Sequence, residues 1–202
     1  MYEVVITNKG RTIIATKNIK IGTIIIKETP LIIGEDVYDI LYKIFNSDNN
    51  EYDDDRIIKS YEELVPHKLD KWVFSYDYLK KDMQTLPVYM QDFFLQFSPC
   101  RLQLLVAKFY RNAFNFSRNN NNFAPSAILF YGNILNHSCD NNIDFEVDKN
   151  GNYIFRTNRD INIGEELCDK YIDVNISLKK RQKILLEQYG FLCMCNKCKI
   201  KE

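Results

Sequence analysis

The sequence contains no apolar run of about 18 residues, and this absence excludes a membrane-spanning helix. We also expect no secretory signal, because the opening MYEVVITNKGR carries Glu3 and polar side chains in place of an apolar core. Neither sign of charge is in surplus, since 27 Lys and Arg balance 27 Asp and Glu. A neutral chain lacks the field that drives strong binding to DNA or RNA. We therefore expect an intracellular protein, nuclear or cytoplasmic, that acts neither on membranes nor directly on nucleic acid.

What the sequence does contain is enough apolar material for a core. Its 202 residues suffice for one ordinary domain or two small ones, and 46% of them are hydrophobic. The 13 Tyr and 13 Phe are typical of a globular protein. Six Cys in an intracellular chain are more typical of metal ligands or free thiols than of a disulfide framework. The sequence does not indicate an oligomeric state.

The pattern of apolar residues predicts strands toward both ends of the chain and helices in its middle. β-Branched residues between glycines predict strands over residues 2–33, and alternation predicts strands again over 126–171. Residues 57–116 carry a helical pattern, whose aromatic side chains we expect to pack in a core. Three prolines are expected to interrupt these helices: Pro66, Pro87 and Pro99.

The C-terminal half also carries two local signals. Lys149-Asn150-Gly151 lies between two alternating segments and predicts a hairpin turn, because Asn-Gly takes a positive φ easily. A last helix is predicted over residues 178–189, with Ser177 as its N-cap and Gly190 directly after its end.

Two polar stretches predict loops. Ser47–Arg56 is acidic and has no apolar periodicity, so we expect a solvated loop; the alternative is an acidic lip that attracts a basic substrate. Asn119–Asn122 is a low-complexity run, which is typical of an exposed loop.

The last residues hold three closely spaced cysteines, Cys193, Cys195 and Cys198. Three thiols cannot all pair with one another, and the C-x-C spacing is poor for a local disulfide. Thiolates that converge on one point suit zinc, which takes four tetrahedral ligands. The pattern therefore favours a zinc site over three free thiols at a flexible end. The residues alone leave the fourth ligand open among four candidates: Cys100, Cys139, Cys168 and His137.

Two further motifs carry polar residues in a fixed order. The first runs from Asn136 to Asn142 as N-H-S-C-D-N-N, and the second is Gly164-Glu165-Glu166-Leu167 with Tyr171 four residues on. Taken singly, a histidine in a loop and a turn into a strand are more often structural than functional. In this order, with the cysteine tail behind them, they match the signatures of one family.

The sequence resembles the SET-domain lysine methyltransferases. Asn136–Cys139 is similar to that family's N-H-S-C-x-P-N, Gly164–Tyr171 to its G-E-E-L-x-x-x-Y, and the tail to its post-SET zinc motif. The likeness covers residues 1–33 and about 104–199. It is closest to the SET-and-MYND (SMYD) branch, through five segments: Lys9–Arg11, Arg111–Phe114, Tyr171–Asp173, Lys180–Gln182 and Gln188–Cys193.

The resemblance implies an α+β fold, namely a β-rich SET fold of several small sheets and a pseudoknot, with a helical insert and a C-terminal post-SET zinc segment. Neither the MYND finger nor the long C-terminal helical domain of the branch is expected, because residues 34–104 hold only Cys100 and the chain stops just after the zinc motif. Four parts are implied: the N-terminal part of the SET domain over 1–34, a mostly helical insert over 35–125, the C-terminal part over 126–175, and a helix with the zinc segment over 176–202.

The implied cofactor is S-adenosylmethionine, and part of its site lies near the N-terminus. Lys9 and Arg11 would meet the methionine carboxylate through charge-assisted contacts. Gly10 would let the backbone approach the cofactor closely. Asn112 would help to fix the methionine end.

The resemblance assigns the rest of this site to the C-terminal half. Asn136 and His137 would contact the amino group and the adenine, and Tyr189 and Phe191 would wall the adenine or the lysine channel. Tyr171 would be the catalytic residue, whose hydroxyl orients the amine and polarises the methyl group. A substrate lysine must lose its proton before it attacks, and desolvation in a narrow aromatic channel favours that loss.

The zinc ligands implied by the resemblance are Cys139, Cys193, Cys195 and Cys198. The metal would pin the C-terminal segment over the cofactor, so that Phe191 can pack.

The sequence departs from the family pattern at four positions. Asn141 stands where the family usually has Pro, which loosens a turn but removes no ligand. Thr12 replaces the usual second glycine of the opening turn, where a Cβ would crowd the cofactor or force a different loop. Asp169 and Lys170 precede the catalytic Tyr, where aromatic or small residues are commoner. Position 169 is where many SET enzymes set the number of methyl groups they add.

The expected function is an S-adenosylmethionine-dependent protein-lysine N-methyltransferase that acts on a lysine of a histone or another protein. The alternative is a catalytically inactive SET fold that binds a protein or peptide. A third class is a zinc-ribbon nucleic-acid binder, which the neutral charge disfavours.

Overall fold

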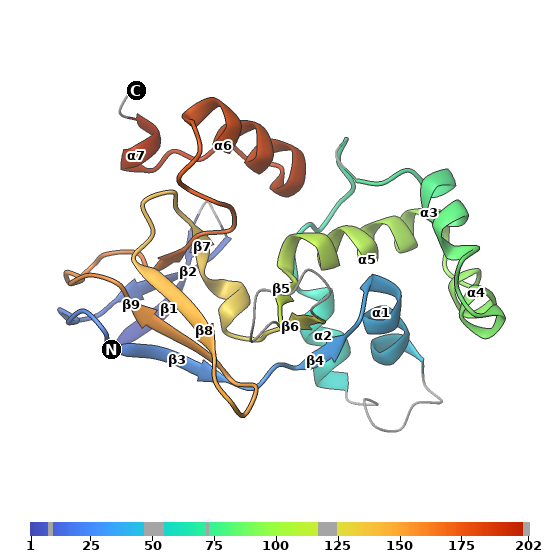
Figure 1. The fold of residues 1–202 in the computed structure, drawn as a ribbon, viewed down its shortest axis with the longest axis horizontal. Coiled ribbons are helices and arrows are strands. Elements are labelled where there is room, and N and C mark those ends of the chain that lie inside the picture. Colours follow the sequence, from blue (N-terminus) through green and yellow to red (C-terminus); the bar gives the residue numbers. More distant parts are fainter. Residues whose placement is uncertain (8–9, 47–54, 72, 117–124, 200–202) are drawn as a thin grey trace. The chain divides into compact units, whose positions relative to one another are not determined.

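The structure is a computed structural model of the chain. It describes residues 1–7, 10–46, 55–71, 73–116 and 125–199 (Figure 1). The chain forms two compact units, one of Met1–Pro30 with Leu129–Glu202 and one of Leu31–Ile128. Helices and several small sheets make up the fold, which confirms the predicted mixed α+β class. No helix of the described residues is long and apolar enough to cross a membrane.

The first unit holds the N-terminal hairpin, in which β1 (Tyr2–Thr7) pairs antiparallel with β2 (Gly10–Ala15). A later segment also bonds to β2, because Ala15 N–H donates to Glu165 O at 2.9 Å and Leu167 N–H donates to Ile13 O at 2.9 Å. The G-E-E-L motif therefore lies directly beside the opening strands.

A second sheet of this unit has the order β3 (Ile24–Glu28), β9 (Tyr153–Thr157), β8 (Ile143–Val147). The predicted hairpin between β8 and β9 is confirmed, since the two strands pair antiparallel and Gly151 between them has a φ of 85°. A third, very short sheet pairs β7 (Asn136–His137) with β10 (Cys168–Asp169) in parallel, after the single turn η1 (Gly132–Ile134).

The C-terminal residues of the first unit are helical. α6 (Leu178–Ile184) continues into a π-helical turn, η2 (Leu185–Tyr189), which confirms the predicted helix. Gly190 ends it with a φ of 80°, as expected. Ser177 does occupy the N-cap position, but its side chain makes no capping hydrogen bond. A short helix, α7 (Asn196–Lys199), follows.

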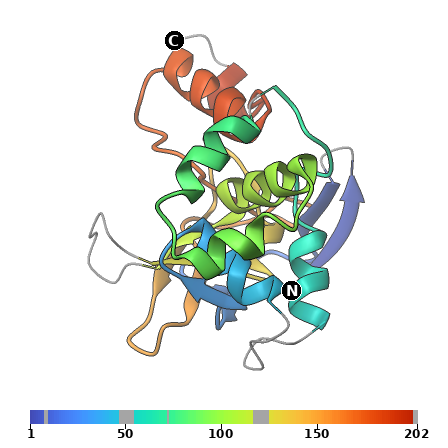
Figure 2. The ribbon, with the colours of Figure 1, turned by 90° about the vertical axis from the view of Figure 1, so that its right-hand side faces the viewer.

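The second unit is mostly helical. A small sheet has the order β4 (Ile32–Gly34), β6 (Ser126–Ile128), β5 (Phe114–Asn115). In both views α5 lies among the other helices of this unit (Figure 1 and Figure 2). The helices are α1 (Val37–Phe45), α2 (Asp55–Glu62), α3 (Tyr76–Met83), α4 (Val88–Phe94) and α5 (Pro99–Asn112).

The helical middle agrees in part with its prediction. Phe94 and Phe109 are buried in the core, as expected of the aromatic residues, whereas Phe74 and Tyr110 are 38% and 51% exposed. Pro87 and Pro99 do stand at helix starts, because a proline needs no intrahelical donor there.

The residues before the acidic stretch form a helix that the sequence analysis did not predict. α1 begins after Asp36, whose carboxylate accepts hydrogen bonds from the N–H groups of Tyr38 and Asp39 at 2.8 Å. The predicted loop Ser47–Arg56 is wrong at its end, where Asp55 already begins α2. The rest of that loop, residues 47–54, and the run 119–122 lie outside the described residues.

Candidate functional site

The short pair of β7 and β10 brings the two polar motifs together. Asn136 lies opposite Cys168 and His137 opposite Asp169. Ser138 N–H extends the pairing by donating to Asp169 O at 2.9 Å. Residues some thirty positions apart in the sequence therefore share one site.

Asn142 holds β10 and the residues just before it in place through side-chain hydrogen bonds, a role that the sequence analysis did not assign to it. The side chain is buried, and its Nδ2 donates to Glu166 O at 2.8 Å and to Glu165 Oε1 at 3.1 Å. Its Oδ1 accepts the N–H of Cys168 at 2.8 Å. The only signal in the sequence is its place at the end of the N-H-S-C-D-N-N motif.

We expect Asn142→Ala to destabilise the protein by about 3 kcal/mol, because it removes the hydrogen bonds that this buried side chain makes to the N–H of Cys168 and to the carbonyl of Glu166. Thermal unfolding followed by circular dichroism measures the effect. The matched control is Asn158→Ala, which removes an exposed asparagine and should change the stability by less than about 0.5 kcal/mol. Equal effects of the two variants would contradict the role of Asn142.

Asn136 connects the pair of β7 and β10 to β2. Its Nδ2 lies 3.1 Å from Arg11 O, 3.1 Å from Thr12 Oγ1 and 3.0 Å from Glu166 Oε1. Its Oδ1 receives no hydrogen bond from the part of the chain that the structure describes, so this acceptor is free for a ligand. Thr12, which departs from the family pattern, is buried and bonds to Thr7 and Asn136, so its side chain braces the hairpin.

His137 and Tyr171 are fixed to each other. Tyr171 N–H donates to His137 Nδ1 at 3.0 Å, which places the ring proton on Nε2. Nε2 lies 3.3 Å from Cys139 Sγ. Burial lowers the pKa of His137 to about 4, so the ring is neutral at pH 7.

The hydroxyl of Tyr171 is also held in place, because it donates to Leu135 O at 2.7 Å. Burial, and then the carboxylate of Asp169, raise the pKa of Tyr171 far above its usual range. Tyr171 therefore presents a neutral hydroxyl at a fixed point over the whole physiological pH range.

Four rings lie close together here and form the aromatic group of His137, Tyr171, Tyr189 and Phe191. The ring of Tyr171 lies 5.3 Å from that of His137 and 5.1 Å from that of Tyr189, and Phe191 lies 6.0 Å from His137. Tyr189 Oη donates to Tyr171 O at 3.2 Å. The group joins β7, the segment after β10, η2 and the tail.

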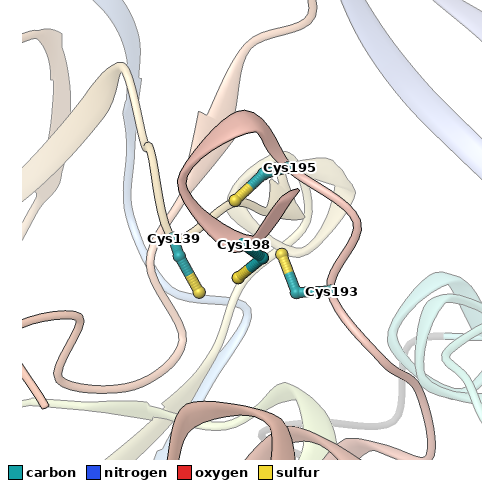
Figure 3. A group of neighbouring side chains, drawn as sticks. All are labelled: Cys139, Cys193, Cys195 and Cys198. Atoms are coloured by element: carbon teal, nitrogen blue, oxygen red, sulfur yellow. The ribbon is translucent and has the colours of Figure 1, made fainter. Parts of the chain in front are cut away.

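The cysteine cluster, Cys139 with Cys193, Cys195 and Cys198, lies next to this group. Figure 3 shows their sulfur atoms turned toward one another, and all four lie within 4.8 Å of each other. Burial raises the pKa of the Cys139 thiol, and neighbouring thiols raise it further. Four soft ligands converging in this way could hold a metal ion.

Gln182 of α6 supports the cluster from outside. Its Nε2 donates to Cys193 O at 2.7 Å, and its Oε1 accepts Cys193 N–H at 2.9 Å. Leu185, Cys139 and Cys193 are buried together, with Phe191 packed against them. The sequence analysis assigned no role to Gln182, although it lies in one of the segments that resemble the SMYD branch.

The structure says less about the remaining residues that were predicted to bind the cofactor. Gly10 has a φ of 91°, and apart from its two chain neighbours no heavy atom of the described residues lies within 4 Å of the position a Cβ would take, which leaves its backbone open to a ligand. Arg11 is half-buried on β2, and Lys9 lies outside the described residues. Asn112 belongs to the helical unit, where its Nδ2 donates to Val65 O and Lys108 O at 2.6 and 2.7 Å. Its contact with the cofactor stays a prediction.

These features define a mixed α+β domain with a polar and aromatic site that a cysteine-bearing tail helps to build. The chain belongs to the SET-domain family, since the family model described as "SET domain" matches residues 10–172. The resemblance predicted from the motifs is confirmed.

Curated relatives agree with this assignment. The putative SET domain-containing protein L678 of Acanthamoeba polyphaga mimivirus is 34% identical over 208 residues, which are 97% of this chain and 76% of the relative. Histone-lysine N-methyltransferase set5 of Schizosaccharomyces pombe is 29% identical over 205 residues, or 100% of this chain and 51% of the relative. Human histone-lysine N-methyltransferase SMYD3 is 39% identical over 69 residues, or 34% of this chain and 16% of the relative. The chain spans about half the length of set5.

Solved structures share the fold. A structure of Rubisco LSMT bound to AdoMet has a TM-score of 0.65 at 14% identity and covers 95% of this chain and 51% of that one. The SET domain of LSMT bound to lysine and AdoHcy has a TM-score of 0.60 at 13% identity and covers 95% and 52%. At such low identity these likenesses establish the fold.

Proposed function

We propose that the chain is an S-adenosylmethionine-dependent protein-lysine N-methyltransferase that acts on a lysine of a histone or another protein. One observation carries the proposal: the Tyr171 hydroxyl is fixed on the carbonyl of Leu135 within a group of aromatic rings. A fixed neutral hydroxyl can orient an amine, and aromatic walls desolvate it, which favours the uncharged, nucleophilic form. The names of set5 and SMYD3 support the reaction class.

The residues of the first unit fit S-adenosylmethionine. The free acceptor Oδ1 of Asn136 suits the amino group of the methionine moiety, and the open backbone at Gly10 gives room for close approach. When bound, the cofactor would supply a methyl group on a positively charged sulfur. His137, Tyr189 and Phe191 provide the flat apolar surfaces that an adenine packs against.

The cysteine cluster fits a structural zinc ion. Tetrahedral zinc with Zn–S bonds of about 2.3 Å separates its sulfurs by about 3.8 Å. The 4.8 Å limit on the four sulfurs is close to that value, and four cysteines leave no open position for catalysis. The ion would hold the tail against Cys139 and so keep Phe191 beside His137.

The test is transfer of tritium from labelled S-adenosylmethionine to purified core histones and to a cell lysate, with the acceptor lysine identified by mass spectrometry. We expect label on lysine with the wild-type chain and a strong loss with Tyr171→Phe. Normal cofactor binding without any transfer would contradict the proposal and favour the alternative of an inactive peptide-binding module.

A further inference from the structure

Asp169 is a buried acidic residue that the proposed function does not yet use. It is 2% exposed and lies on β10, two residues before Tyr171. In the pair of β7 and β10, Asp169 lies opposite His137, whose ring lies 5.3 Å from that of Tyr171. Directly opposed residues of two paired strands project to the same face, so the Asp169 side chain lies on the side of the His137 ring. After burial, the carboxylate also raises the pKa values of both Tyr171 and Tyr189.

Within the described residues, no cationic side chain pairs with this carboxylate. From the part of the chain that the structure describes, the carboxylate accepts one hydrogen bond, in which the backbone N–H of Lys170 donates to Oδ1 at 2.7 Å. The Lys170 ammonium bonds instead to Asp144 on β8, at 2.6 Å. His137, its register partner on β7, has its two ring nitrogens directed to Tyr171 N–H and Cys139 Sγ.

A buried carboxylate without a cation is costly, and proteins keep such groups mainly where a ligand or a reaction uses them. The titratable groups around Asp169 are the neutral His137, Tyr171 and Tyr189, the acidic Asp144, and the already paired Lys170. None of them neutralises Asp169. The described residues therefore supply no cation for this carboxylate, and a partner would have to come from a ligand.

We propose that Asp169 binds the ε-ammonium group of the substrate lysine beside Tyr171 and accepts its proton. This proposal rests on the proposed methyltransferase function. In the step an N–H bond of the ammonium breaks, an O–H bond forms on the Asp169 carboxylate, and the electron pair stays on nitrogen as the nucleophile. The proton leaves Asp169 to water before the next turnover.

The electrostatics suit a proton acceptor. Burial raises the pKa of Asp169 to about 7, although the backbone N–H and charge of Lys170 oppose the rise. Near neutral pH the group is therefore ionised in a large share of molecules and can both take up and release a proton. The aromatic surroundings lower the pKa of an incoming lysine at the same time, which brings the pKa of the proton donor closer to that of the acceptor.

The first test is the pH dependence of methyl transfer to the peptide found methylated in the label-transfer experiment. We expect the wild-type rate to rise with pH and to level off above about 7. Asp169→Asn, which keeps the shape but not the charge, should be about 100-fold slower at pH 7 and should gain rate up to pH 9, because bulk solvent must then deprotonate the lysine. The matched control is Asp160→Asn, an exposed residue that pairs with Lys20 and should keep the wild-type profile.

The second test measures binding without turnover. By calorimetry with S-adenosylhomocysteine present, the wild-type chain should bind the lysine peptide at least tenfold more tightly than the same peptide with norleucine, and Asp169→Asn should lose that preference. Asp169→Ser replaces Asp169→Asn in both tests if the latter does not fold. An Asp169→Asn variant that keeps the wild-type pH profile and the wild-type preference for the lysine peptide overturns the role of Asp169 but leaves the proposed function standing. A wild-type chain that transfers no methyl group at any pH overturns the proposed function, and the role of Asp169 with it.

Discussion

Cys198→Ser is expected to release the metal from the cysteine cluster and to lower the melting temperature of the protein by roughly 10 °C. One lost thiolate leaves three ligands, too few to close a structural zinc site. The tail would then lose its tie to Cys139, which is buried and lies 3.3 Å from the ring of His137. A loss of about 3–5 kcal/mol corresponds to a shift of this size in a chain of about 200 residues.

The metal content per chain, measured by inductively coupled plasma mass spectrometry, tests the ligand set, and differential scanning calorimetry tests the stability. Cys100→Ser is the matched control, because Cys100 is exposed on α5 and lies outside the cluster. It should keep one zinc ion per chain and the wild-type melting temperature. A Cys198→Ser protein that still carries one zinc ion per chain would show that the assignment of Cys198 is wrong.

The cysteines also show how far sequence reasoning reaches. Cys193, Cys195 and Cys198 lie within six residues, so their spacing alone predicts that they converge. The fourth member could not be chosen from the residues, because its approach depends on the fold. β7 places Cys139 beside β10, while α6 and η2 return the tail to the same point. Only the resemblance to a family singled out Cys139 among four candidates.

Side chains that support the site through long-range hydrogen bonds were not predictable in the same way. Asn142 and Gln182 act through the backbones of Cys168 and Cys193, and nothing in the local sequence says which backbone groups will come within reach. The helix α1 is a different case. Asp36 is a good N-cap, and Val37, Ile40, Leu41 and Ile44 follow it at helical spacing, but the neighbouring acidic stretch hid this signal.

Tyr171→Phe is expected to lower the rate of methyl transfer by about 100-fold or more while cofactor affinity stays within about twofold. The substitution removes one oriented hydroxyl, and losing one such group typically costs a factor of 10² to 10³. The ring can keep its place, because it is held by Tyr171 N–H on His137 Nδ1 and by the neighbouring ring of Tyr189. Single-turnover kinetics measure the rate, and calorimetry measures the binding of S-adenosylmethionine.

The pH dependence separates the hydroxyl of Tyr171 from a proton acceptor. Burial holds the pKa of Tyr171 far above its usual range, so the phenol stays protonated from pH 6 to 9 and adds no inflection to the rate profile. The Phe variant should therefore be slower by the same factor at every pH, whereas the effect of Asp169→Asn should shrink as the pH rises. Tyr131→Phe, on an exposed ring of the same unit, is the matched control and should leave the rate unchanged. A Tyr171→Phe protein that transfers methyl groups at the wild-type rate would mean that the hydroxyl does not orient the amine.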